Sequence, residues 1–574
     1  MQKTRKNIKL FIKLISIIII MLLALSACNE ADDPDIPPEG TPVVNGGDGG
    51  SAYVPTPEPS FLNPRAVSGT QPENMIAAAS VMADGQITET FNFFPRFNFA
   101  HGDEYSKIEA ITTFRGNNFR ENASFGYANI TEGTLTEIWK RSTGSLTAPD
   151  GALWRGHGWT GQPLITKWPV ETRAIMSNMF DWAKEQEELT EVIYAAMDGY
   201  IYFQELETGK DTRDKLFIGW TFKGSGAIDP RGYPLLYVGA GYDSALGNAK
   251  IFIISLIDGA ILYTFGQDDS FAPRKLPEPH SYADSSPLIC TLNDRLIYPS
   301  ENGLLYIMDL NTRYNPEFGA ISVSPSDIIK WRFDGKRHEQ GGMFWYGIES
   351  SVSIFEGFAY ISDNGGHMLC LNLNTLEIVW VHDSLDDTNN SPVFSIENEK
   401  AYIYLGAGFH GGWRAPADTA AQTPIWKLNA ETGEIIWQVN YNCHTVSGVS
   451  GGIQGTIASG SNSLSDLIFV PVARTPTQGA GVLAAIRKST GEIVWEHTSV
   501  YSWSSPVCVY NADGKGYIIH TDTAGDMFLL DGLTGQLLSS INLGSLVEAS
   551  PAVFNNIAVV GTKGGMDIRG VRLS

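Results

Sequence analysis

Nine loop residues of this 574-residue chain carry side chains that could hold a ligand. Trp and Tyr rings stack on a sugar, a quinone or a peptide side chain, while carboxylates, amides and imidazoles fix the orientation of what is bound. The competing interpretation, that Trp159, Trp345 and Trp503 only pack against neighbouring structure, stays open. The candidates are His157, Trp159, Tyr282, Trp345, Glu349, Asn390, His444, Trp503 and Glu548.

No spacing in the sequence supports metal or covalent chemistry. The histidines at 157, 280, 410 and 444 do not follow a metal-ligand spacing, and there is no C-x-x-C motif. Four isolated cysteines, Cys290, Cys370, Cys443 and Cys508, are expected to be buried small hydrophobes. We therefore predict no metal, no cofactor and no catalytic residue.

The elements that would position the candidates form a repeat. Leu428–Trp437 has the sequence LNAETGEIIW, Ile486–Trp495 has IRKSTGEIVW, and Leu371–Trp380 is a third copy with Leu376 in place of Gly. The pattern predicts a strand, a tight turn and an outer strand, because Gly supplies the positive φ that closes such a hairpin. We expect four Trp residues to cover the neighbouring unit: Trp139, Trp380, Trp437 and Trp495.

A second recurring element lies upstream in each unit and marks its first strand. Eight such starts are found, at Gln162, Gly226, Ser286, Ser351, Ser391, Gly452, Ser505 and Ser550. Each precedes an apolar run, so one unit has four short antiparallel strands, at about the repeat length of propeller blades. The sequence predicts an all-β, eight-bladed β-propeller, with seven blades as the fallback if the unit around Ala227 is miscounted.

The ring must also be closed, because an open sheet edge invites aggregation. The last unit has strands near 557–561 and 567–573 but lacks its own Trp strand. Leu135–Lys140 has the features of an outer strand without inner strands before it. We expect these N- and C-terminal segments to complete one blade together.

These motifs give residues 110–574 a resemblance to a known family. The T-G-x-x-x-W copies at Thr432 and Thr490, with Phe114-Arg115-Gly116-Asn117 ahead of the first outer strand, resemble the pyrroloquinoline-quinone-like (PQQ-like) repeat family of eight-bladed propellers. That family includes quinoprotein dehydrogenases, the outer-membrane assembly lipoprotein of the β-barrel machinery, and lipoproteins with no assigned activity. The repeat implies the propeller but leaves the chemistry open, since it is a packing device between blades.

The resemblance implies a binding site for PQQ and Ca²⁺ in the family's dehydrogenases, and the residues of this chain can be compared with that site. The family dehydrogenases are similar to one another in a vicinal Cys–Cys disulfide against the quinone, a Trp on its other face, and Glu, Asn and Asp around Ca²⁺. This chain has no adjacent cysteines and no oxygen-ligand cluster that the sequence alone assigns. PQQ with Ca²⁺ is therefore expected only if the chain is a quinoprotein oxidoreductase.

The first residues are typical of an export signal. Five basic residues precede an apolar run, and Leu25-Ser26-Ala27-Cys28 resembles the bacterial lipobox, so we predict a signal peptide at 1–27 and lipidation of Cys28. The alternative is an ordinary signal peptide whose cleavage site precedes a Cys. Residues 28–65 are expected to be a disordered tether, 66–107 a weakly ordered extension, and 108–574 the propeller.

Composition excludes one class of partner. The net charge of -23 argues against nucleic-acid binding, since phosphates are bound by Lys and Arg. We expect a monomeric, lipid-anchored, non-catalytic propeller on the cell membrane or outer membrane, facing the extracytoplasmic space and binding a protein or peptide partner. The alternatives are the quinoprotein oxidoreductase and a carbohydrate-binding surface module.

Overall fold

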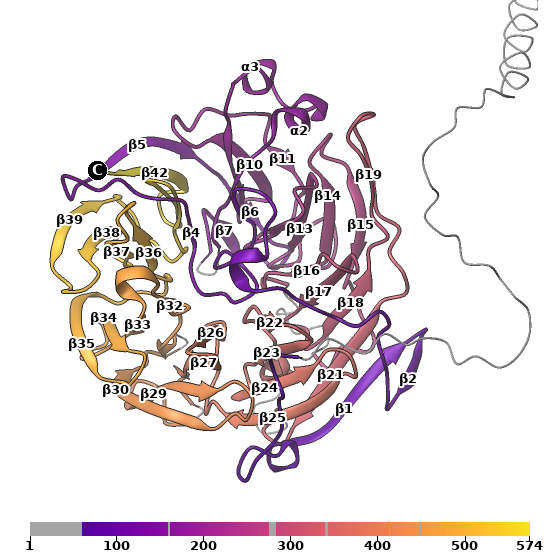
Figure 1. The fold of residues 1–574 in the computed structure, drawn as a ribbon, viewed down its shortest axis with the longest axis vertical. Coiled ribbons are helices and arrows are strands. Elements are labelled where there is room, and N and C mark those ends of the chain that lie inside the picture. Colours follow the sequence, from indigo (N-terminus) through magenta and orange to yellow (C-terminus); the bar gives the residue numbers. More distant parts are fainter. Residues whose placement is uncertain (1–59, 159–160, 275–282, 339–342, 413, 448) are drawn as a thin grey trace, which may run out of the picture. The chain divides into compact units, whose positions relative to one another are not determined.

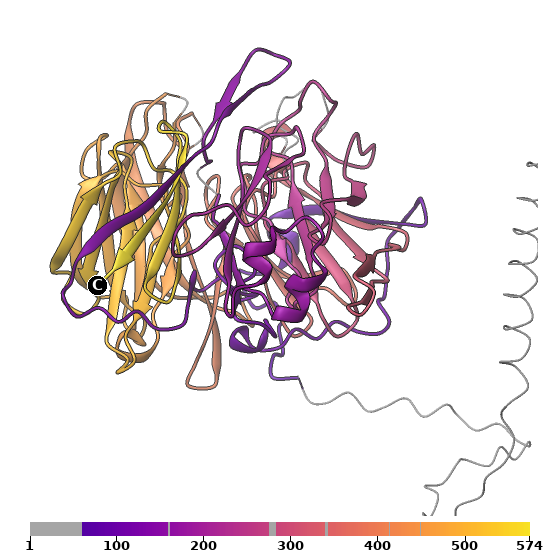
Figure 2. The same cartoon turned by 90° about the horizontal axis from the view of Figure 1, so that it is seen from above.

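The computed structural model describes residues 60–158, 161–274, 283–338, 343–412, 414–447 and 449–574. Between Ser60 and the C-terminus, eight antiparallel sheets of four to six strands surround one axis, as Figures 1 and 2 show. The predicted all-β, eight-bladed propeller is confirmed. Among the described residues, no helix is long and apolar enough to span a membrane.

The first four blades follow the chain in order, and each runs from its inner strand A to its outer strand D. Blade 1 has β8 (Leu164–Lys167), β9 (Thr190–Ala195), β10 (Tyr200–Glu205) and β11 (Leu216–Phe217). Blade 2 has β12 (Ala227–Ile228), β13 (Leu235–Gly239), β14 (Ile251–Ser255) and β15 (Ile261–Phe265). Blade 3 has β16 (Leu288–Cys290), β17 (Arg295–Pro299), β18 (Leu305–Asp309) and β21 (Ile329–Gly335). Blade 4 has β22 (Ser353–Phe355), β23 (Phe358–Ser362), β24 (His367–Asn372) and β25 (Glu377–Asp383).

The last four blades continue in the same way. Blade 5 has β26 (Val393–Glu397), β27 (Lys400–Gly406), β29 (Ala420–Asn429) and β30 (Ile435–His444). Blade 6 has β32 (Ala458–Ser459), β33 (Leu467–Ala473), β34 (Ala480–Arg487) and β35 (Ile493–Val500). Blade 7 has β36 (Val507–Tyr510), β37 (Gly516–Thr521), β38 (Asp526–Asp531) and β39 (Leu537–Asn542). Blade 8 has β40 (Ala552–Phe554), β41 (Ile557–Thr562), β42 (Asp567–Leu573) and β5 (Leu135–Ser142).

Shorter elements decorate this frame. β1 (Ile76–Ala83) and β2 (Gln86–Thr88) extend blade 3 outward beyond β21. Two short helices, α2 (Val170–Ile175) and α3 (Asp181–Lys184), lie between strands A and B of blade 1. The others are β3 (Ala110–Ile111), β4 (Ser124–Phe125), the hairpins β6 (Ser145–Thr147) with β7 (Leu153–Arg155) and β19 (Arg313–Asn315) with β20 (Ala320–Ser322), β28 (Gly408–Phe409), β31 (Gly451–Gly452), and 3₁₀ turns η1 (Pro72–Asn74), η2 (Gly102–Glu104), η3 (Met343–Tyr346) and η4 (Asn462–Leu464).

The closure of the ring is confirmed in register. β5 pairs antiparallel with β42, from Leu135 opposite Leu573 to Ser142 opposite Asp567. Blade 8 therefore takes three strands from the C-terminal end and its outer strand from the N-terminal part. β5 also supplies Trp139, whose indole Nε1 donates to Leu206 O of blade 1.

One predicted strand start was wrong by a few residues. The sixth strand A is β32, which begins after Thr456, whereas Gly452 belongs to β31 and pairs with β28 and β33. The reason is the insertion after β27, which brings Gly408 and Phe409 beside Gly451 and Gly452 and forms a short extra ladder there. The pair Gly452-Ile453 resembles a strand start of the repeat, but Gly452 lies in β31 and not in strand A.

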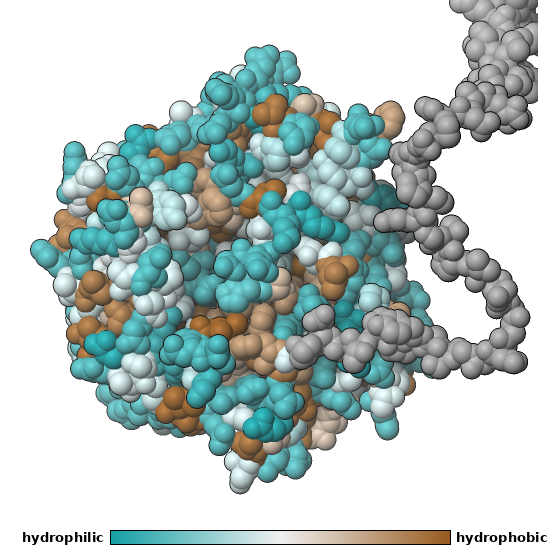
Figure 3. All heavy atoms as spheres, in the orientation of Figure 1, coloured by the Kyte–Doolittle hydropathy of each residue, from teal (hydrophilic) through white to brown (hydrophobic). Residues whose placement is uncertain are grey.

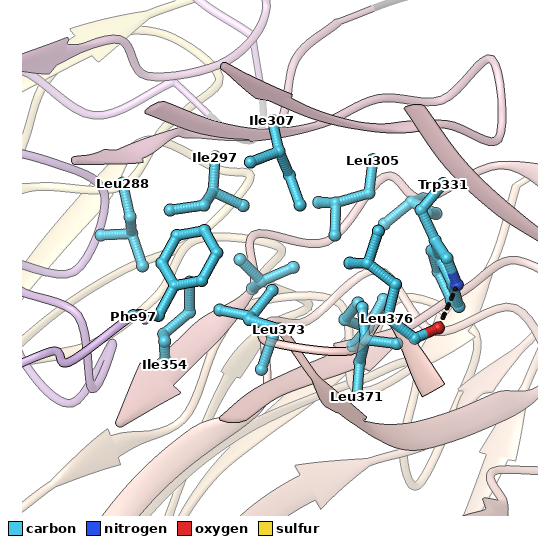
Figure 4. Close-up of a cluster of buried hydrophobic side chains, with 14 of the residues drawn as sticks. Phe97, Leu288, Ile297, Leu305, Ile307, Trp331, Ile354, Leu371, Leu373 and Leu376 are labelled. Carbon is cyan, nitrogen blue, oxygen red and sulfur yellow. Dashed lines mark hydrogen bonds between the residues drawn. The ribbon is translucent and has the colours of Figure 1, made fainter. Parts of the chain in front are cut away.

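Apolar cores lie between consecutive blades, because inner strands are buried on both faces. Figure 4 shows the core of blades 3 and 4, where Leu288, Ile297 and Ile307 face Ile354, Leu371 and Leu373. Phe97 from the N-terminal extension enters the same core and is 3% exposed. Residues 97–105 thus fill an interblade space. The cysteines at 290, 370, 443 and 508 are all free and buried, as expected from their isolation.

Candidate binding site on the propeller axis

Residues 110–125, which we call the axial belt, contact the inner strands of all eight blades in chain order. The belt begins with β3 paired to β8 of blade 1 and ends with β4 parallel to β40 of blade 8. The intervening bonds are Ile228 N–H to Thr112 O, Thr113 Oγ1 to Pro287 O, Ile354 N–H to Asn118 O, Phe394 N–H to Phe119 O, Ser459 N–H to Glu121 O, and Cys508 N–H to Asn122 Oδ1. In Figure 1 the indigo-to-purple chain crosses the centre of the wheel.

Two buried arginines hold the belt in place. Arg120 donates to the carbonyls of Val352, Phe114 and Ser286, and to Thr113 Oγ1, at 2.7 to 2.9 Å. Arg115 donates from Nη2 to Pro506 O at 2.7 Å. Burial lowers the pKa of Arg120 to about 9 and that of Arg115 to about 10. Arg120 is thus held by three carbonyl oxygens and one hydroxyl, and Arg115 by one carbonyl, which makes both arginines structural.

A ring of side-chain hydroxyls lies next to the belt, one at the start of each strand A from blade 2 to blade 8. The backbone N–H of one member donates to the hydroxyl of the member on the next blade. These bonds link neighbouring blades around the axis. These bonds run from Ser286 to Ser351, Ser351 to Ser391, Ser391 to Thr456, Thr456 to Ser505 and Ser505 to Ser550, at 2.9 to 3.0 Å, and Gln162 N–H donates to Ser225 Oγ at 2.7 Å. We call this set the hydroxyl ring.

A second layer stands two residues before each member of the hydroxyl ring. Extended backbone turns side chains i and i+2 to the same side, so both layers face the axis. This rim consists of Lys223, Asp284, Glu349, Asn389, Gln454, Trp503 and Glu548. Five of these residues and five of the hydroxyl ring line one pocket together with Phe114 of the belt. The pocket is therefore closed on its inner side and has an empty volume of about 320 Å³, open mouth included.

Buried charge gathers on one side of this axial pocket. Oxygens of Asp284, Glu301 and Glu349 lie within 4.8 Å of one another, and Lys223 Nζ is 2.7 Å from Asp284 Oδ2 and 4.0 Å from Glu349 Oε1. Burial, with the charges of Asp284 and Glu349, raises the pKa of Glu301 well above its usual value. Although burial opposes it, the attraction of Asp284, Glu301 and Glu349 raises the pKa of Lys223.

The acidic character continues onto blade 5. With its amide oriented to suit its neighbours, Asn389 donates to Glu349 Oε2 at 2.8 Å and to Asp387 Oδ1 at 3.2 Å. Burial raises the pKa of Asp387 well above its usual value, and Glu349 and Asp386 raise it further. The next carboxylate, Asp386, is bound by Arg414 Nε at 2.9 Å. Asp387 is thus a further buried carboxyl group close to Glu349.

A second buried cluster, on blade 4, is a hydrogen-bond network. Asp363 Oδ2 lies 2.8 Å from His338 Nε2 and 2.9 Å from His367 Nδ1. His338 Nδ1 accepts the N–H of Gly335 at 2.9 Å, so its proton is on Nε2 and is donated to Asp363. Both ring nitrogens of His338 are used in this way. The ring of His338 also packs on Tyr346 of the turn η3, with centroids 4.1 Å apart. This network therefore supports η3 and leaves no nitrogen of His338 available for a metal ion.

The structure brings part of the predicted site together. Glu349 and Trp503 line the axial pocket. Glu548 stands at the equivalent rim position of blade 8, where Lys563 Nζ lies 2.7 Å from Oε2. Two further candidates, Trp159 and Tyr282, fall outside the described residues.

The remaining candidates lie elsewhere. His157 is packed against Tyr194, with ring centroids 4.0 Å apart, and burial lowers its pKa to about 3. Asn390 points away from the axis, since Nδ2 donates to the carbonyls of Gly406 and Ile453. His444 bonds through Nε2 to Pro476 O at 3.0 Å. Trp345 is 7% exposed and lies 6.4 Å from the His410 ring.

Sequence reasoning missed several lining residues. Lys223, Asp284, Asn389 and Gln454 stand on the rim, and Glu301 approaches from strands B and C of blade 3. A signal for the rim was present, because each of its members stands two residues before a Ser or Thr that itself precedes a strand A. No comparable signal exists for Glu301, which reaches the cluster only through the fold of its blade.

Comparisons with known proteins show similarity of structure. No protein-family model and no curated protein sequence matches the chain. The quinohemoprotein alcohol dehydrogenase ADHIIG from Pseudomonas putida superposes with a TM-score of 0.52 and 11% identity, covering 81% of this chain and 80% of that chain. The Comamonas testosteroni quinohemoprotein alcohol dehydrogenase gives 0.50 and 11%, covering 83% and 82%. The chain therefore shares the propeller fold of these two dehydrogenases. BamB from Moraxella catarrhalis gives 0.45 and 14%, covering 76% and 99%.

Since the fold is shared with quinohemoprotein dehydrogenases, the residues of the axial pocket can be tested for their fit to PQQ and Ca²⁺. Three carboxylates offer the oxygen ligands that Ca²⁺ prefers. However, the ammonium of Lys223 lies 2.7 Å from Asp284 and places a positive charge inside that ligand set. The empty volume of about 320 Å³ includes the open mouth, so the enclosed part of the pocket is smaller than a typical small-molecule site, and the four described cysteines are free. The residues present therefore do not fit the Ca²⁺–PQQ pair.

Proposed function

We propose that this chain is a lipid-anchored, extracytoplasmic propeller that binds a protein or peptide partner at the axial pocket. The observation that carries the proposal is the shape of the channel. The axial belt closes it on one side, with Phe114 lining the inner part of the pocket, while charged and polar rim residues surround the mouth. A blind polar pocket suits the capture of a protruding side chain or loop, which enters and leaves by one opening.

The hydroxyl ring supports binding rather than reaction. Catalytic hydroxyls are activated by an adjacent base. Here the Oγ atoms of Ser351, Ser391 and Ser505 accept backbone N–H groups from the preceding blade. These hydroxyls act as fixed parts of the frame, which keeps the pocket in one shape and lowers the entropy that a partner must lose.

The first described residues contact the face of the propeller opposite the pocket, which supports a pocket left accessible to a partner. Phe61 N–H donates to Glu356 in the turn between strands A and B of blade 4, and Arg65 N–H donates to Glu431 O in the turn between strands C and D of blade 5. Both turns lie at the ends of the strands opposite the loops that lead into strand A. The described part of the chain therefore begins on the face away from the pocket.

Site-specific photo-cross-linking in intact cells tests this function. A photoreactive residue at Trp503 should trap a protein partner, whereas the same residue at Phe318, which is 80% exposed on the β19–β20 hairpin, should not. Equal trapping at both positions, or none at Trp503, would contradict the proposal. Cys28→Ala should move the protein from the membrane fraction to the soluble fraction.

A further inference from the structure

The charges around the axial pocket are not balanced within the described residues. Four buried carboxyl groups, Asp284, Glu301, Glu349 and Asp387, face two buried basic groups, Lys223 and Arg274. Arg274 Nη1 donates to the main-chain carbonyl of Glu301 at 3.1 Å. Lys223 lies close to Asp284 and farther from Glu349. Carboxyl groups therefore outnumber basic groups beside the pocket, and burial together with their mutual repulsion raises the pKa values of Glu301 and Asp387.

One of these groups also has a vacant hydrogen-bonding position. Glu301 is 2% exposed, and its Oε2 accepts no hydrogen bond from any residue that the structure describes. Its carboxylate lies in the cluster with Asp284 and Glu349. Leaving a buried carboxyl oxygen without a hydrogen-bond partner costs free energy, and an added donor would recover it. The cluster is thus suited to a ligand that brings both positive charge and N–H groups.

The remaining lining favours a carbon chain that ends in such a cation. Trp503 and Phe114 give the pocket aromatic walls, and the amides of Asn389 and Gln454 give it neutral polar ones. A cation beside an aromatic face and a carboxylate gains from both, and a guanidinium binds a carboxylate through two parallel hydrogen bonds. The empty volume of about 320 Å³ includes the open mouth, so the pocket has room for the charged end of one side chain at its mouth and not for a whole side chain inside.

We propose that the mouth of the axial pocket binds the basic group of an arginine or lysine in a partner polypeptide, with Glu349 as its carboxylate partner, Glu301 behind Glu349 in the same cluster, and Trp503 as its aromatic wall. This inference rests on the proposed function and names the chemistry of the partner. The existing ammonium of Lys223 beside Asp284 shows the same type of pairing within the chain.

The test is calorimetric titration of the full-length protein in detergent micelles with three blocked tripeptides. Their central residue is arginine, lysine or citrulline, the last having the shape of arginine without its charge. We expect the arginine and lysine peptides to bind and the citrulline peptide to bind at least ~10-fold more weakly, since losing a charged partner in a buried pair has a large effect. Binding should release protons, seen as a dependence of the heat on buffer, because Glu301 gains a positive neighbour.

Variants separate charge recognition from a general loss of structure. Glu349→Gln and Trp503→Ala should each weaken arginine-peptide binding by ~10-fold or more. Asp466→Asn is the matched control, since it removes the same charge from a surface carboxylate paired with Arg487, and it should leave binding unchanged. Folding of every variant is checked by its thermal transition. If Glu349→Gln does not fold, Asp387→Asn and the decrease of affinity with added salt replace it.

The outcomes distinguish this inference from the proposed function. Equal binding of the citrulline and arginine peptides, or binding of CaCl₂ alone with no binding of any peptide, would overturn the basic-side-chain proposal. Cross-linking at Trp503 could then still succeed and leave the proposed function standing. Peptide binding without any cross-linked partner would support the pocket chemistry and contradict the proposed function.

Discussion

Trp139 of blade 8 packs directly on Gly209 of blade 1. The indole Nε1 donates to Leu206 O at 2.7 Å, and a Cβ added to Gly209 would come within 2.5 Å of the ring. The same relationship joins Trp380 to Gly433, Trp437 to Gly491 and Trp495 to Gly535. The Thr-Gly turn and the Trp of the repeat are therefore two halves of one contact between neighbouring blades. At Trp139 this contact also closes the ring.

Replacing Trp139 should loosen the closure between blades 8 and 1. Trp139→Ala removes a buried indole and its hydrogen bond, so we expect a loss of ~3–5 kcal/mol in the free energy of unfolding. Hydrogen exchange should accelerate in β42 before it does in the other blades. Trp154→Ala, on the β6–β7 hairpin, is the control and should leave exchange in β42 unchanged. Uniform acceleration in all blades would contradict a local role in closure.

Arg120 should be essential for the axial belt. Arg120→Met keeps much of the volume but leaves the carbonyls of Val352, Phe114 and Ser286 without their buried donor. We expect a loss of at least ~2 kcal/mol in urea unfolding. Arg487→Met, at a surface arginine paired with Asp466 and Glu492, should change stability by ~1 kcal/mol or less. A similar loss for both substitutions would argue against a special role of the belt.

Glu301 should make the protein less stable at neutral and higher pH. Because burial and the neighbouring carboxylates raise its pKa in the folded state above 4.5, its contribution is fully present below pH 4.5 and is lost as the pH rises through the folded-state pKa. Glu301→Gln imitates the protonated form. Glu301→Gln should raise the melting temperature by a few degrees at pH 8 and should leave it unchanged near pH 4. The opposite order, with Glu301→Gln less stable at pH 8, would show that the ionised carboxylate supports the fold.

His157 should make the protein sensitive to acid. Burial lowers its pKa from 6.5 to about 3, so its stabilising contribution is present above pH 6.5 and is lost as the pH falls toward 3. In His157→Leu the free energy of unfolding should depend less steeply on pH in this window, by up to ~1.4 kcal/mol per pH unit. His444→Leu, outside the interblade core, is the control. Unchanged steepness in His157→Leu would mean that other groups determine the acid sensitivity.

Much of the surface gives no further indication of function. The face in Figure 3 is mostly hydrophilic, with apolar residues scattered among polar ones. Large apolar patches mark many interaction sites. The buried charges of the axial pocket are therefore a stronger indication of ligand chemistry than the visible surface.

The propeller could be predicted because its information is local and repeated. A Thr-Gly turn, a Trp at a fixed offset and an apolar run are sufficient to define a blade, and eight repetitions define the ring. The sixth start was placed wrongly at Gly452, since a Gly-Ile pair resembles a strand start when the insertion after β27 is read without its partners. Only the pairing of β28 with β31 in the structure shows that Gly451 and Gly452 belong to a separate short strand before strand A of blade 6.

The sequence by itself determined the eight blades, their closing strand and the position of Glu349, Trp503 and Glu548 before strand starts. Only the tertiary structure decided which polar groups meet. The belt of residues 110–125 reaches all eight blades, and Glu301 joins Asp284 and Glu349, because closure of the ring brings distant inner strands to one axis. Likewise, His157 and Asn390 turn into the interblade packing. Strand pattern follows from neighbouring residues, whereas the composition of a central pocket depends on how all the blades are arranged around it.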